Sequence, residues 1–162
     1  MFIQQFANDL YGTGFSTGIR QITWFIPMIQ SIHIVAIAAL VGAAMVSDLR
    51  LAGVLATQET PRTVVKRYLP WMWAALGLLL LTGGLMTVGE PNRVLTNWVF
   101  WTKMALILAA FVMTLLFRYP ILHPEFRLEH ARWAVLVKPM AWISLAIWIV
   151  VIFCGRWIAY AI

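Results

Sequence analysis

The sequence predicts an all-α fold, a bundle of four transmembrane helices preceded by a short interfacial helix at the N-terminus. Hydrophobic residues make up 62% of the 162 residues and charged residues only 11%, whereas soluble domains contain about 45–50% apolar and about 25% charged residues. The apolar residues form four continuous stretches, unlike the alternating ten-residue segments of a membrane β-barrel. Residues 1–162 are therefore expected to form a single integral membrane domain.

The N-terminal segment is expected to lie at the membrane surface. It has no basic start and no continuous apolar run, so it does not resemble a cleaved signal peptide. Phe2, Ile3, Phe6 and Leu10 share one helical face, which predicts a short amphipathic helix. The glycine-rich segment 12–18 is then expected to form a turn.

The four apolar stretches supply the membrane helices. At a rise of about 1.5 Å per residue, each is long enough to cross a hydrocarbon core of about 30 Å. The expected spans are residues 22–47, 69–88, 98–117 and 139–160.

The connection before the second stretch carries helix-start signals. Thr60 is suited to an N-cap and Pro61 to the first helical position. A separate small helix over residues 61–68 is therefore expected to lead into the second membrane helix.

The basic residues are distributed unevenly between the two ends of the bundle. Because cytoplasmic loops retain Lys and Arg, the side with more of them is expected to be cytoplasmic and both termini periplasmic. The net charge of +6 then reflects topology and contact with anionic lipid headgroups, and no nucleic acid is expected as a partner. Eight basic residues lie in the connections between stretches one and two and between three and four, and four on the opposite side: Arg50, Arg62, Lys66, Arg67, Arg118, Arg127, Arg132 and Lys138 against Arg20, Arg93, Lys103 and Arg156.

His33 is the most informative single residue, because an ionisable side chain inside a membrane helix is costly and usually functional. It shares a helical face with Ala36, Ala44 and Ser47, and small or polar residues mark the faces of membrane helices that contact one another. Counted from Trp24, it lies roughly 13 Å below the outer surface. We therefore expect His33 to face the bundle interior.

Two further basic residues lie in the same outer half. Lys103 and Arg156 are each about 7 Å deep, where they either extend to lipid headgroups or receive an anionic group of a ligand held against His33. A b-type haem fits the second possibility, with His33 as axial ligand of the iron and the propionates at Lys103 and Arg156. Met104, about 9 Å deep, is the only thioether near the level of a second axial ligand.

The other histidines do not complete a bis-histidine haem site. His123 and His130 belong to the connection after the third helix, about 20 Å too deep to share an iron with His33. A five-coordinate haem, a pair of His33 residues across a homodimer, or a quinone bound by His33 would each avoid this difficulty. His33 is alternatively satisfied by an interhelical hydrogen bond to a Thr or Ser hydroxyl. The spacing of His123, Glu125, Glu129 and His130 matches no metal-binding pattern.

Other chemistry-bearing patterns are missing from the sequence. Asp48 and Arg50 are expected to form a salt bridge at the inner end of the first helix. Cys154 is the only cysteine, which excludes an internal disulfide and a thiolate metal cage. No nucleophile with its base and no phosphate-binding loop is present, so hydrolysis and phosphoryl transfer are not supported. A channel or transporter is disfavoured because no carboxylate is expected within the membrane.

Several short runs of the chain are distinctive. They are Pro27-Met28-Ile29-Gln30-Ser31-Ile32-His33, Ser47-Asp48-Leu49-Arg50-Leu51-Ala52-Gly53, Leu69-Pro70-Trp71, Thr82-Gly83, the helix of Lys103 and Gly155-Arg156-Trp157-Ile158-Ala159-Tyr160. In these runs, most specifically the first two, the chain resembles an uncharacterised family of bacterial four-helix membrane proteins, a domain of unknown function. The likeness extends over nearly the whole chain from Trp24, and it implies the fold and the bacterial inner (cytoplasmic) membrane. More distantly, the chain is similar to copper-resistance-type and cytochrome b561-type bundles, which implies haem by analogy. Where members of the family often carry a histidine at the end of the third helix, this chain has Phe117.

Two functions of different class remain open at this point. In the first, the chain is a small subunit of a redox complex that binds haem b or quinone near His33 and passes electrons between an external partner and the quinone pool. In the second, it is a cofactor-free anchor or scaffold subunit of a larger membrane complex. Both imply the lipid bilayer, other membrane subunits or a second copy of the chain as partners, and in neither is the chain expected to be an enzyme by itself.

Overall fold

A computed structural model describes residues 2–123, 131–158 and 160 of the chain, and the structural statements that follow concern those residues. They fold into helices and no strand, and four helices are long and apolar enough to cross a membrane. The predicted all-α, four-helix fold class is confirmed. The long helices are α3 (Phe25–Leu51), α4 (Pro61–Gly89), α6 (Trp98–Met113) and α8 (Ala131–Trp157).

Helix α4 begins earlier than expected. The separate helix predicted over residues 61–68 is wrong, because these residues are the first two turns of one continuous helix. Thr60 is its N-cap, with Oγ1 accepting a hydrogen bond from the Thr63 amide at 3.3 Å. Pro61 fits the first turn, where its missing amide proton costs nothing, and Pro70 is accommodated inside the helix.

The third long apolar helix changes from an α-helix to a π-helix near its end. Helix α6 passes directly into the π-helical turn η1 (Thr114–Arg118) and the short α7 (Tyr119–Ile121). At the start of η1, Thr114 Oγ1 donates a hydrogen bond to the Ala110 carbonyl of α6 at 2.9 Å. Such wide turns occur mostly as isolated interruptions of α-helices, frequently at functional sites.

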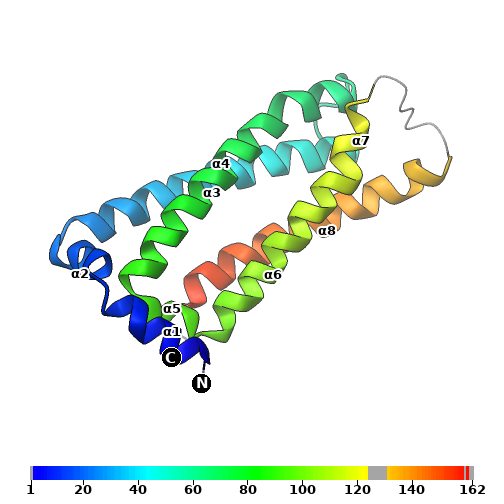
Figure 1. The fold of residues 1–162 in the computed structure, drawn as a ribbon. Helices are drawn as coiled ribbons and strands as arrows, with labels where there is room; N and C mark the ends of the chain where they lie inside the picture. Colours follow the sequence, from blue (N-terminus) through cyan, green and yellow to red (C-terminus); the bar gives the residue numbers. More distant parts are fainter. Residues whose placement is uncertain (1, 124–130, 159, 161–162) are drawn as a thin grey trace.

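The four long helices form two antiparallel pairs (Figure 1). Helix α3 packs along α4, α6 packs along α8, and α3 also packs against α8, whereas the described parts of α4 and α6 have little contact with each other. The main core, which includes Leu40, Ala44, Met72 and Trp148, lies where the two pairs meet. The bundle is therefore closed on the α3–α8 side and looser on the α4–α6 side.

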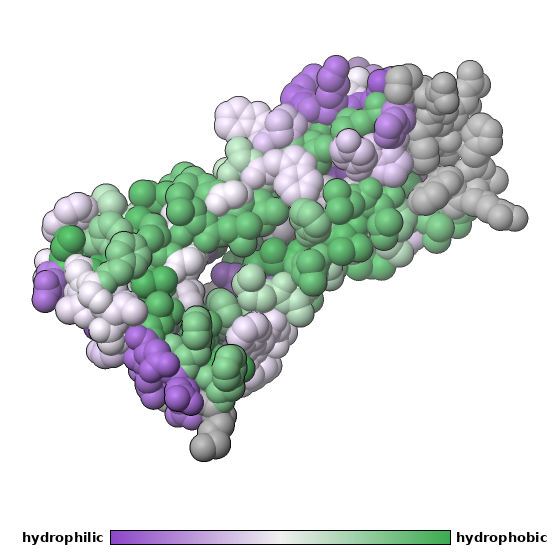
Figure 2. Space-filling model, viewed as in Figure 1, coloured by the Kyte–Doolittle hydropathy of each residue, from purple (hydrophilic) through white to green (hydrophobic). Residues whose placement is uncertain are grey.

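The outside of the bundle is hydrophobic. Figure 2 shows a broad apolar surface between hydrophilic groups that gather at the two ends. Large apolar side chains such as Val35, Leu81 and Phe153 are mostly exposed, which is the surface expected of helices that face lipid.

Three short helices cover the end of the bundle where α8 finishes (Figure 1). The predicted N-terminal helix is present as α1 (Phe2–Tyr11), but the turn predicted over residues 12–18 is wrong, because this segment belongs largely to a second helix, α2 (Gly14–Gln21). Thr13 caps α2 by accepting a hydrogen bond from the Ser16 amide at 3.3 Å, a strong start signal that offsets the weak helix propensity of glycine. The third is α5 (Pro91–Leu95), which packs against α1.

We predict that Ser16→Ala loosens α2 from the bundle. Ser16 Oγ donates to the Val88 carbonyl at 2.7 Å and accepts from Arg20 Nη1 at 2.5 Å, and losing such a bond costs about 1 kcal/mol. Hydrogen exchange of the α2 amides should then become about fivefold faster. The control Thr17→Val removes a hydroxyl bonded only within residues 13–20 and should leave exchange at the α2–α4 contact unchanged. Equal exchange in the wild type and Ser16→Ala would contradict the prediction.

Candidate ligand-binding site

A cavity of about 400 Å³ lies between the two helix pairs, in the half of the bundle nearest α1, α2 and α5. Its volume falls within the range of about 300–1,000 Å³ that is usual for small-molecule sites. All four long helices contribute to its wall, which is mostly apolar. The polar or polarisable side chains among the lining residues are His33, Thr87, Lys103, Met104 and Trp148.

His33 is held in a defined orientation by the neighbouring helix. Its Nδ1 lies 2.7 Å from Thr82 Oγ1, and the Thr82 hydroxyl donates its own proton to the Leu78 carbonyl, also at 2.7 Å. The Thr82 oxygen therefore accepts, which places the imidazole proton on Nδ1 and the lone pair on Nε2. Gly83 lies beside the ring, and a Cβ there would be in ordinary van der Waals contact with His33 Cε1, at 3.5 Å.

This hydrogen bond matches one of the two alternatives drawn from the sequence. An interhelical bond from His33 to a Thr hydroxyl is present. It uses one ring nitrogen, and Nε2 has no hydrogen-bond partner within the described part of the chain. Because His33 also lines the cavity, the second nitrogen remains available to accept a hydrogen bond or to bind a metal ion.

Lys103 presents an ammonium group to the same cavity. No described residue forms an ion pair with it, although the side chain is only partly exposed. Gly155 on α8 lies beside it, and a Cβ there would be in ordinary van der Waals contact with Lys103 Nζ, at 3.6 Å. A cation in an apolar wall is costly without a partner. An acceptor within the cavity, either water or a group of a ligand, would lower this cost.

The structure brings together three of the four predicted site residues. His33, Lys103 and Met104 line the cavity, whereas Arg156 is not among the lining residues. The Arg156 side chain is exposed, and its Nη2 donates a hydrogen bond to Tyr160 Oη at 2.7 Å. A role of Arg156 in holding a ligand of this cavity stays a prediction.

His123, the described histidine of the loop, lies away from this site. His123 is exposed near α7, at the opposite end of the bundle, where its ring packs edge-on against Tyr119 with centroids 5.9 Å apart. The predictions made for His130, Glu125 and Glu129 lie outside the described residues.

The salt bridge predicted between Asp48 and Arg50 is wrong. Asp48 pairs with Arg118 of η1, whereas Arg50 Nε donates to the Glu59 carbonyl at 2.7 Å. Residues two apart on a helix point in different directions, so one face of α3 buries Asp48 and another carries Arg50 to the loop. The two paired side chains are almost completely buried, with exposed fractions of 1% for Asp48 and 3% for Arg118.

The Arg118 guanidinium joins all four membrane spans. Its Nη2 donates to Asp48 of α3 and, at 3.2 Å, to Ser144 Oγ of α8. Its Nη1 lies 3.1 Å from Met72 Sδ of α4 and 3.5 Å from Thr114 Oγ1.

The bundle thus does contain a buried carboxylate, contrary to the sequence-based expectation. The sequence did contain a signal for this burial. Asp48 follows Ala44 by four residues, so it lies on the same face of the helix as His33, the face that was predicted to point into the bundle.

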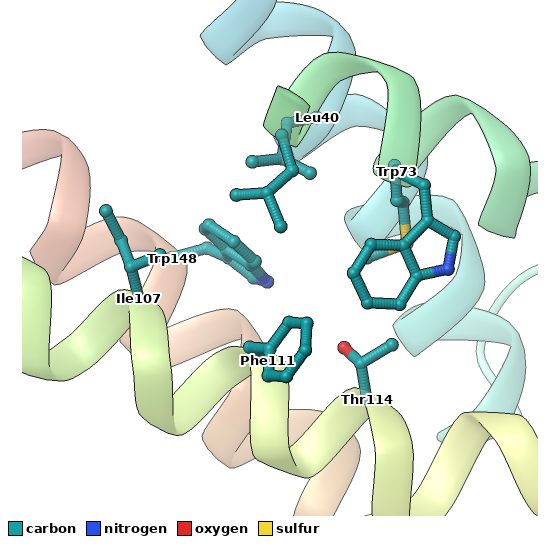
Figure 3. A pocket seen from close by; sticks show the side chains of 8 residues that line it. Leu40, Trp73, Ile107, Phe111, Thr114 and Trp148 are labelled. Atoms are coloured by element: carbon teal, nitrogen blue, oxygen red, sulfur yellow. The ribbon is translucent and has the colours of Figure 1, made fainter. Parts of the chain in front are cut away.

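A smaller cavity of about 20 Å³ lies next to the main one (Figure 3). Trp73 and Phe111 meet edge to face across it, with ring centroids 5.3 Å apart. The indole nitrogen of Trp148 faces this space (Figure 3) and has no hydrogen-bond partner among the described residues. The volume suffices for one water molecule, which would accept the indole proton.

The fold and this cavity define a class, the small all-helical proteins with four helices long and apolar enough to cross a membrane and a cavity between them. The chain matches a family of unknown function, DUF6644, over residues 14–161, and it belongs to that family. This agrees with the resemblance to an uncharacterised family, whereas nothing links the chain to copper-resistance or cytochrome b561 families. No curated protein and no solved structure matches the chain.

We predict that the buried pair is a strong determinant of stability. Asp48→Leu or Arg118→Leu alone should lower the free energy of unfolding by about 3–5 kcal/mol, because each leaves an uncompensated buried charge. The loss in free energy of unfolding of the double variant should be smaller than the sum of the losses of the two single variants. Denaturant unfolding followed by circular dichroism in detergent measures this coupling.

The control for this comparison of the single and double variants is Glu59→Gln. It breaks the exposed Glu59–Arg67 pair, whose atoms are 2.8 Å apart, and exposed pairs contribute about 1 kcal/mol or less. Strictly additive effects of the two leucine substitutions would show that the charges do not interact.

Proposed function

We propose that this protein is a small membrane subunit of a redox or electron-transfer complex, and that it binds haem b or a quinone in the cavity beside His33. The observation that carries the proposal is that His33, Lys103 and Met104 line one cavity. An imidazole with a free nitrogen, an unpaired ammonium and a thioether are thereby offered to the same ligand, within an otherwise apolar wall.

The residues of the cavity fit the requirements of such a cofactor. With Nδ1 donating to Thr82, His33 presents Nε2 in the manner of a metal-binding histidine whose other nitrogen is fixed by a hydrogen bond. Met104 lies in the same wall, and Lys103 is available to a carboxylate or a carbonyl oxygen. A bound haem or quinone would supply electron transfer, for which the protein provides position and electrostatics.

The cellular setting belongs to the same proposal. We place the protein in the bacterial inner membrane with both termini on the periplasmic side, which the excess of Lys and Arg in the opposite connections supports. With little chain outside the membrane spans, it would act with other membrane subunits or with a second copy of itself.

The second candidate is a cofactor-free anchor or scaffold subunit. The hydrogen bond between His33 and Thr82 favours it, because it gives the histidine a purely structural role. The unpaired Lys103 argues for a bound ligand instead, since a scaffold has no need of a cation facing an apolar cavity.

The visible absorption spectrum and an organic extract of the purified protein test the proposal. We expect either a Soret band or co-purified quinone, and we expect His33→Ala to abolish the band or to lower the quinone content by about tenfold, as loss of one buried polar contact can do. The control is His123→Ala, which changes an exposed histidine at the other end of the bundle and should leave both readouts unchanged. A colourless, quinone-free protein that retains its fold would favour the scaffold.

A further inference from the structure

We infer that the occupant of the cavity is a quinone that enters sideways from the bilayer between α4 and α6. This inference rests on the proposed function and narrows it to one of its two cofactors. It is carried by three features of the described residues, namely the open side of the cavity, the pair of polar groups on its wall, and the position of Arg156.

The open side of the cavity faces lipid. Helices α4 and α6 both line the cavity but have little direct contact. Two lining residues of α4, Leu80 and Gly84, are exposed, and both belong to the apolar span Pro61–Gly89. Figure 2 shows a hollow in the hydrophobic flank of the molecule, with hydrophilic atoms visible within it. A ligand dissolved in the bilayer therefore reaches the polar groups without crossing water.

The polar groups offer one acceptor and one donor. His33 Nε2 carries a lone pair, because Nδ1 donates to Thr82, and Lys103 Nζ carries protons that no described residue accepts. An oxidised quinone has two carbonyl acceptors, which suit Lys103, and a quinol has hydroxyl donors, which suit His33 Nε2. The isoprenoid tail would lie against the leucine-rich wall of α4 and leave through the opening.

Haem fits this wall less well. Its two propionates need cationic or polar partners, and Lys103 is the one basic side chain besides His33 on the described wall. Arg156, the second partner expected from the sequence, instead donates to Tyr160. A quinone has no carboxylates, so a single ammonium is sufficient.

Two glycines of α4 provide a matched test. A Cβ at Gly84 or at Gly77 would meet no atom within 4 Å, so both positions have open space at the point where a side chain would begin. Gly84 lines the cavity, and Gly77, two turns earlier on the same helix, does not. Leucine at position 84 would enter the opening, whereas leucine at position 77 would lie two turns away from it along α4.

The experiment titrates decylubiquinone into the full chain in lipid nanodiscs and follows quenching of tryptophan fluorescence. We expect saturable binding in the wild type and in Gly77→Leu, and binding weakened about tenfold or more in Gly84→Leu, because the side chain takes the place of the ring or tail. Leu80→Trp would close the same opening and replaces Gly84→Leu in the experiment if that variant fails to fold. Lys103→Met should weaken binding as well, because it removes the donor.

The outcomes separate the inference from the function on which it rests. Equal binding in the wild type and Gly84→Leu, or quenching that never saturates, would overturn the quinone site. A Soret band that depends on His33, together with no quinone binding, would overturn it too and would leave the redox function standing through haem. If neither a Soret band nor quinone binding is found, the quinone inference and the proposed redox function are both overturned.

Discussion

The buried pair of Asp48 and Arg118 determines how the rest of the bundle can be arranged. A guanidinium in this position must keep its partners, since an unpaired buried charge costs several kcal/mol, and the partners of Arg118 come from all four membrane spans. The two helix pairs are thereby held together at the end where α3 finishes and α4 begins. Towards the opposite end no such cluster joins α4 to α6 among the described residues, and it is there that the cavity lies.

The difference between the tightly joined end of the bundle and its looser end also explains the orientation of His33. Helices α3 and α4 are close along their length, and the imidazole lies against α4, where Thr82 fixes it. The ring is anchored by the tightly packed pair and faces the space that the second pair leaves open. Lys103 approaches from that second pair, beside Gly155 of α8. The two polar groups of the site therefore come from different helix pairs and meet in the space between them.

Composition and continuous apolar stretches were enough to predict four helices, because in a membrane the backbone leaves few alternatives. The inward direction of His33 followed from the residues that share its face. The pairing of Asp48 could not be obtained in this way, since Arg118 appeared to belong to a loop and only the π-helical turn places it within the bundle. The role predicted for Arg156 rested on its depth along the helix, and depth does not give the direction of a side chain near a helix end, where Arg156 donates a hydrogen bond to Tyr160.

The wall of the cavity, rather than its volume of about 400 Å³, is the argument for a particular kind of occupant. Lipid tails can fill an apolar gap between helices, but they offer nothing to an ammonium or to an imidazole nitrogen. A wall that combines Lys103 and His33 with leucines is therefore suited to an occupant with a polar head and an apolar tail, which is what the proposed quinone has.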